Sequence, residues 1–73
     1  MIKARVHLIC TLPGEEPFSY RTDVLALTRD PQWVYDEAIG HVIKALLEIK
    51  KPAHRISITA HTVEWVPTLK GKD

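Results

Sequence analysis

Four histidines and a single cysteine are the residues of this chain whose types could do chemistry. His7 and Cys10 stand three residues apart in an alternating segment, so their side chains point to opposite faces of a strand and cannot form a thiolate–imidazole pair. No C-x-x-C, H-x-x-x-H or H-E-x-x-H spacing occurs, whereas zinc requires three or four such ligands. His7 and His61 could form a metal or pH-sensing pair on the outer faces of neighbouring strands. Ordinary surface histidines are the simpler interpretation, and we expect no catalytic residue, no metal and no cofactor.

Glu15 and Glu16 are two adjacent carboxylates, and they are expected to lie in a turn where both are solvated. The three glycines are not clustered, so no phosphate-binding loop is expected. We therefore predict that the protein is not an enzyme. An oligomeric enzyme, with a cleft between subunits lined by His7 and His61, is a hypothesis that stays open.

Hydrophobic periodicity predicts two strands joined by a short turn. Residues 2–12 alternate between apolar and mostly polar side chains, which is typical of a strand with one buried face. The segment 13–17 breaks the pattern with Pro-Gly, a pair suited to a turn. Residues 18–28 form the second strand. Its apolar phase changes near Asp23, which predicts a bulge or an early strand end there.

A long helix and a third strand follow the hairpin. Asp30 can cap a helix, and the proline after it is well tolerated at the first helical position. An apolar stripe with helical spacing follows as far as Ile49, the helix is expected to extend to Lys50 and Lys51, and Pro52 ends it. Residues 54–66 return to alternation and predict the third strand.

These elements assemble into one fold by a simple rule. A right-handed strand–helix–strand crossover makes the third strand parallel to the second and places the first between them. We therefore predict an α+β domain of ββαβ type, a three-stranded antiparallel sheet in the order 2-1-3 with one long helix packed on one face. The other face is bare. It is expected to carry Lys3, Arg5, His7, Ile9 and Thr11 beside Arg55, Ser57, Thr59, His61, Val63 and Trp65.

Length and composition bound the function. Residues 1–67 are expected to form a single domain and residues 68–73 a flexible tail. Ten basic and nine acidic residues leave a net charge of +1, without the surplus expected of a duplex-binding domain. One cysteine excludes a disulfide scaffold, and the apolar runs are too short for a signal peptide or a spanning helix. A cytoplasmic location away from membranes is therefore expected.

The segment Ile2–Tyr20 combines an alternating strand, a Pro-Gly-x-x-Pro turn and a second strand that begins with an aromatic residue. In this it resembles small prophage-encoded ββαβ accessory proteins, and the later helix-then-strand order agrees across most of the chain. The resemblance implies a class of short proteins that grip a host protein. It implies no role for any individual residue.

The leading hypothesis is a non-enzymatic protein-binding module, a small phage-type inhibitor or accessory protein that forms a homodimer. Surplus apolar residues on the helix and open strand edges favour it. The predicted protein-binding residues are Trp33, Ile43, Leu47, Val63 and Trp65. The alternative is a single-stranded nucleic-acid-binding protein, in which bases stack on a ring of the bare face and phosphates meet cations. Its residues are Lys3, Arg5, His7, Arg55, His61 and Trp65.

Overall fold

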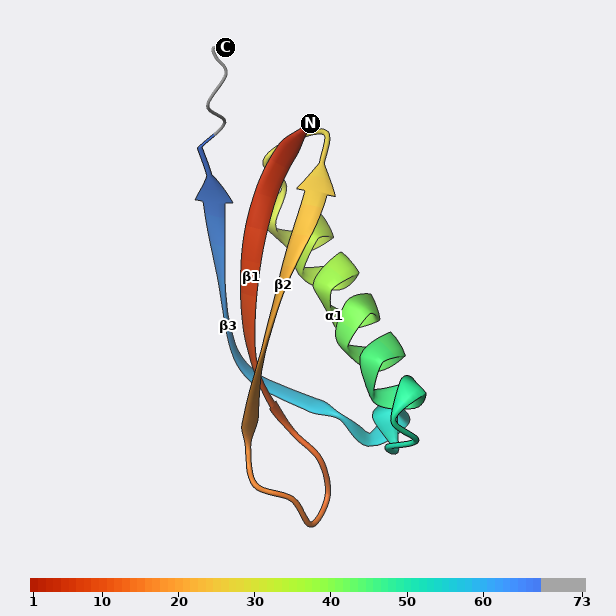
Figure 1. Ribbon diagram of the computed structural model, residues 1–73. Coiled ribbons are helices and arrows are strands. Elements are labelled where there is room, and N and C mark those ends of the chain that lie inside the picture. The colour runs from red at the N-terminus through yellow and green to blue at the C-terminus, as the bar shows by residue number, and fades with distance from the viewer. Residues whose placement is uncertain (68–73) are drawn as a thin grey trace.

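The computed structural model describes residues 1–67 of the 73-residue chain (Figure 1). Its elements are β1 (Ile2–Thr11), β2 (Phe18–Ala26), α1 (Pro31–Glu48), a short 3-10 turn η1 (Ala53–Arg55) and β3 (Ser57–Val66). The strands form one antiparallel sheet in the order β2-β1-β3, and α1 packs on it. The predicted α+β fold and strand order are confirmed. The tail predicted at residues 68–73 lies outside the described residues.

The hairpin keeps a single register. β1 and β2 pair over nine consecutive residue pairs without a shift, so the prediction of a bulge or an early strand end near Asp23 is wrong. The strand continues to Ala26, and the out-of-phase Leu25 points away from the core and is exposed. In the turn, the N–H of Glu15 donates to the carbonyl oxygen of Leu12 at 3.1 Å. Gly14 has a φ of 78° there, which only glycine adopts without a steric cost.

Both ends of α1 are fixed by local hydrogen bonds. At the start, Oδ1 of Asp30 accepts the backbone N–H groups of Gln32 and Trp33 at 3.2 and 3.3 Å, as an N-cap does. The last helical residue is Glu48, two to three residues before the predicted end at residues 50–51. The reason is Lys50, whose φ of 60° is left-handed and turns the chain out of the helix.

The core lies between α1 and the side of the sheet that faces it. α1 packs mainly against β2 and least against β3, and the molecule is thin, with extents of 47 × 22 × 16 Å (Figure 1). Within residues 1–67 no second layer covers the outer face of the sheet. The buried residues are Ala4, Val6, Leu8, Cys10, Leu12, Val24, Ala26, Val34, Ala38, Val42, Leu46 and Ala53.

β3 carries the irregularity that the sequence pattern placed in β2. Ile9 pairs with Ala60 and Cys10 with Ile58, so Thr59 is an extra residue without a partner on β1. Such a bulge exchanges the two faces of a strand, because side chains alternate with a period of two.

The bulge overturns the predicted faces of the last half of β3. Residues directly opposite each other in a sheet share a face, and His61, Val63 and Trp65 lie opposite the buried Leu8, Val6 and Ala4. They therefore point to the helix side, not to the outer face as predicted. The residues of β3 that share the outer face with Lys3, Arg5, His7, Ile9 and Thr11 are Ser57, Ala60, Thr62, Glu64 and Val66.

Candidate functional site

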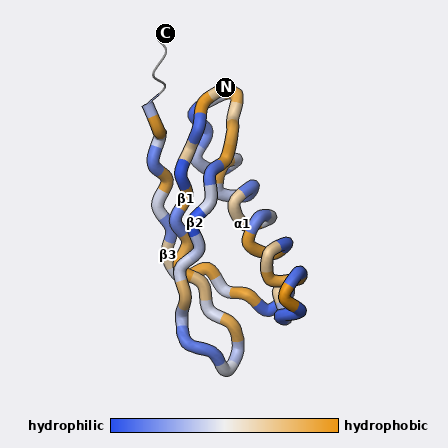
Figure 2. Tube along the Cα trace, viewed as in Figure 1, coloured by the Kyte–Doolittle hydropathy of each residue, from blue (hydrophilic) through white to orange (hydrophobic). Residues whose placement is uncertain are grey.

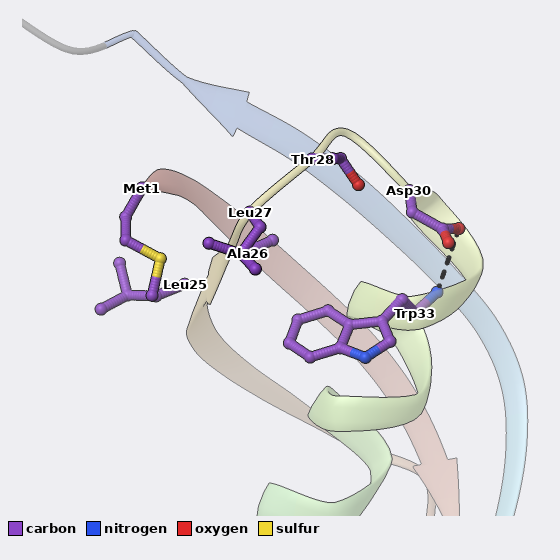
Figure 3. Close-up of a pocket in the computed structure, with 7 residues that line it drawn as sticks. All are labelled: Met1, Leu25, Ala26, Leu27, Thr28, Asp30 and Trp33. Atoms are coloured by element: carbon purple, nitrogen blue, oxygen red, sulfur yellow. Dashed lines mark hydrogen bonds between the residues drawn. The ribbon is translucent and has the colours of Figure 1, made fainter.

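An apolar pocket of about 500 Å³ lies where β2 ends and α1 begins (Figure 3). It is lined by Met1, the segment 25–28, Asp30 and Trp33. Figure 3 shows the indole of Trp33 extending from the first turn of α1 towards the end of β2, with Met1 and Leu25 on the far side of the hollow. Three separate parts of the chain therefore build the pocket.

The side chains around the pocket are exposed to an unusual degree for their type. Leu27 is 83% exposed, Met1 76%, Leu25 55% and Trp33 45%. Four of the six exposed large hydrophobic residues among residues 1–67 thus gather at one place, and Figure 2 shows the end of β2 as a continuous hydrophobic stretch. Clustered exposed apolar groups mark binding surfaces, whereas single ones need no explanation.

Local structure explains why these side chains are not buried. Val24 and Ala26 of β2 take up the helix-facing positions, so Leu25 points to the other face of the sheet. Leu27 follows the last strand residue and lies outside the sheet. Trp33 lies in the first turn of α1, one residue before Val34, which faces the core. Adjacent helical residues differ in direction by about 100°, so Trp33 cannot also enter the core.

Few polar groups reach the pocket. They come from Thr28 and Asp30, and Oδ1 of Asp30 is already engaged by the N–H groups that it caps. A volume of about 500 Å³ falls within the roughly 300–1,000 Å³ of pockets that hold small molecules, and it also has room for a large side chain. The pocket is therefore suited to an apolar group with at most one or two polar atoms.

The predicted protein-binding residues do not form one surface. Trp33 lines the pocket. Leu47 is 60% exposed and Ile43 is partly buried against the core, both on later turns of α1. Val63 and Trp65 pack partly buried on the helix side of β3. The five residues therefore lie at three separate places: the pocket, the later turns of α1, and β3.

The residues predicted to bind nucleic acid are also separated. Lys3, Arg5 and His7 lie on the outer face of β1, whereas His61 and Trp65 lie on the helix side of β3. His61 contacts the ring of Tyr35 on α1, with centroids 4.1 Å apart. Arg55 belongs to η1. The alternative in which His7 and His61 form a pair is therefore excluded, because the two side chains lie on opposite faces of the sheet. The ring of Trp65, predicted to stack with bases, is not on the face that carries Lys3 and Arg5.

Charges on the outer face largely compensate one another. Nε of Arg5 lies 3.4 Å from Oδ1 of Asp23, and Nζ of Lys3 lies 3.9 Å from Oδ2 of the same carboxylate. Glu64 stands directly opposite Arg5 on β3. These partly exposed ion pairs contribute little stability. They do lower the positive potential that would attract a phosphate backbone.

Other chemistry finds no support in the described part of the chain. Residues 1–67 contain no group of three or more His, Cys, Asp or Glu side chains placed to hold a metal ion. Cys10 is fully buried, and burial raises the pKa of its thiol, which disfavours the reactive thiolate. No helix within residues 1–67 is long and apolar enough to cross a membrane.

Comparison with protein-family models, with curated proteins and with solved structures gives no match. The surfaces of the chain are therefore what indicates a function. The pocket residues Met1, Leu25 and Leu27 were not among the predicted site residues. The signal in the sequence is that Leu25 and Leu27 are out of phase with the other apolar residues of β2, the feature that predicted a bulge or an early strand end.

Proposed function

We propose that this protein is a non-enzymatic protein-binding module whose pocket receives a large apolar side chain of its partner. The observation that supports this most strongly is the convergence of Met1, Leu25, Leu27 and Trp33 around one hollow. Binding energy at protein interfaces concentrates on a few anchors, often aromatic, that fill such pockets. A module of this size acts by occupying a surface of another protein, as a small inhibitor or accessory factor does.

The size of the expected effect follows from burial. An aromatic anchor buries about 150–250 Å². At about 25 cal/mol per Å² this gives roughly 4–6 kcal/mol of gross stabilisation. The loss of translational and rotational freedom on association costs a comparable free energy. Further contacts around the pocket rim must therefore contribute to the affinity as well. Leu27 and Met1 have the most exposed large apolar side chains of the rim and are placed to make these contacts.

Selection from a random peptide-display library tests the proposal without a known partner. Peptides enriched on the purified protein should share a large apolar residue and bind through it. Leu27→Glu places a charge at the rim and should raise the Kd of these peptides about 10- to 100-fold, because burying a leucine is worth about 1.5–3 kcal/mol. Trp33→Ala should raise the Kd at least as much.

Leu47→Glu is the matched control. Leu47 is also exposed, but it lies on a later turn of α1 and does not line the pocket. The proposal predicts that this variant binds the selected peptides like wild type. If Leu47→Glu abolishes binding and Leu27→Glu does not, the binding surface is the helix flank and the pocket proposal fails.

A further inference from the structure

β3 is the least covered strand of the sheet. α1 packs against it less than against the other strands, and Figure 1 shows β3 at the edge away from the helix. Residues 59–62, in the middle of the strand, are all exposed. Both faces of β3 are therefore open there, because successive side chains point to opposite faces. Its outer edge also has no neighbouring strand within residues 1–67.

An edge of this kind is suited to pairing with another strand. Backbone N–H and C=O groups along a free edge are unpaired, and natural sheets guard such edges with charges, lysine or proline. Among the ten residues of β3, Glu64 is the only Asp, Glu, Lys or Arg, and there is no proline. The opposite edge is better protected. β2 carries Arg21 and Asp23, and Oγ1 of Thr22 lies 2.8 Å from Nδ1 of His41 on α1.

We propose that β3 pairs antiparallel with β3 of a second copy, which joins the two sheets into one of six strands. A two-fold axis perpendicular to the sheet produces this pairing and leaves both helices on the same face. The pairing is centred on His61, so Ala60 of one copy lies opposite Thr62 of the other on the outer face. The partly buried Val63 and Trp65 of both copies lie on the face that carries the helices. This surface is on the opposite edge of the sheet from the apolar pocket.

Three features favour a second copy as the occupant. The unpaired groups are backbone groups of a strand, so their natural partner is a strand. A two-fold axis makes a strand its own antiparallel partner, and such isologous contacts are the commonest in oligomers. A net charge of +1 produces little repulsion between copies.

Light scattering at high micromolar concentration tests the pairing. Wild type should have twice the chain mass of 8.3 kDa. The double variant Ala60→Lys/Thr62→Lys places two cations on the outer face of β3 and should be monomeric. The variant Ala60→Glu/Thr62→Glu should be monomeric as well. Mixing the two in equal amounts should restore the double mass, because opposite charges then face each other across the pairing.

Ser19→Lys is the matched control. The new lysine and the native Arg21 place two cations on the outer face of β2, two residues apart as in the lysine variant of β3. This control protein should remain dimeric. Thermal unfolding by circular dichroism confirms that each variant is folded. A wild-type mass of 8.3 kDa at every concentration would overturn the proposal. So would dissociation by Ser19→Lys alone, or a mixture of folded charge variants that stays monomeric.

Discussion

Lys50 holds a backbone conformation that the residue type disfavours, and replacing it should stabilise the protein. Its φ of 60° is the only positive φ of a non-glycine residue within residues 1–67. The N–H of Lys51 donates to the carbonyl of Leu46 at 2.9 Å, and that of Lys50 to Leu47 at 3.0 Å. This pair of bonds is the Schellman motif, in which glycine is the usual left-handed residue. A residue with a Cβ adopts this conformation at a cost of about 1–2 kcal/mol.

Lys50→Gly removes this strain but also makes the unfolded chain more flexible, which lowers the free energy of unfolding by about 0.4–1 kcal/mol. The appropriate reference is Lys50→Ala, which removes the same charge and keeps the strain. We expect the glycine variant to be more stable than the alanine variant by about 1 kcal/mol. For a domain of this size, that difference corresponds to a rise in Tm of roughly 4–8 °C.

Thermal unfolding followed by circular dichroism measures this difference, at one protein concentration because dimerisation would shift Tm. Lys44→Gly and Lys44→Ala provide the control at an exposed right-handed position inside α1. There glycine should be the less stable residue by about 1 kcal/mol. If Lys50→Gly is no more stable than Lys50→Ala, the left-handed cap does not store the strain assigned to it.

Two further predictions concern the helix cap and the buried thiol. Asp30→Ala should lower the free energy of unfolding in urea by about 1 kcal/mol, because two N–H groups lose their acceptor. Asp30→Asn should stay close to wild type, and an equal loss in both variants would contradict the capping role. Burial raises the pKa of Cys10, so as pH rises through its ordinary value of 9.0 the unfolded chain loses a proton that the folded chain keeps. Stability should therefore fall with rising pH in this range, and the fall should be smaller in Cys10→Ala. Equal pH slopes for the two proteins would refute this assignment.

The sequence pattern was sufficient for the arrangement of the elements. The alternation of residues 2–12 and the helical stripe that begins after Asp30 both reflect a buried face, and burial dominates folding. The strand order then followed from the handedness of the crossover. The helix end was predicted two to three residues late, since nothing in a lysine indicates that Lys50 adopts a left-handed conformation.

The faces of β3 and the pocket could not be predicted in the same way. Neither Ala60 nor Thr62 has a strong preference for a buried or an exposed face, so the sequence does not show that the strand changes phase at Thr59. The same alternation was therefore predicted for the whole of residues 54–66. The pocket depends on bringing Met1 and Trp33, which are far apart in the sequence, to opposite sides of one hollow. No local pattern encodes such a long-range arrangement.

Fluorescence of Trp33 is the measurement that tests the pocket most directly. The chain has two tryptophans, and Trp65→Phe leaves Trp33 as the only one. A selected peptide with an apolar anchor should shift the emission of Trp33 to shorter wavelength. This shift should saturate at the same peptide concentration as the binding heat measured by calorimetry. In the Leu27→Glu background, about 10- to 100-fold more peptide should be needed. If the binding heat saturates while the emission of Trp33 stays unchanged, the peptide binds elsewhere and the pocket is not the recognition site.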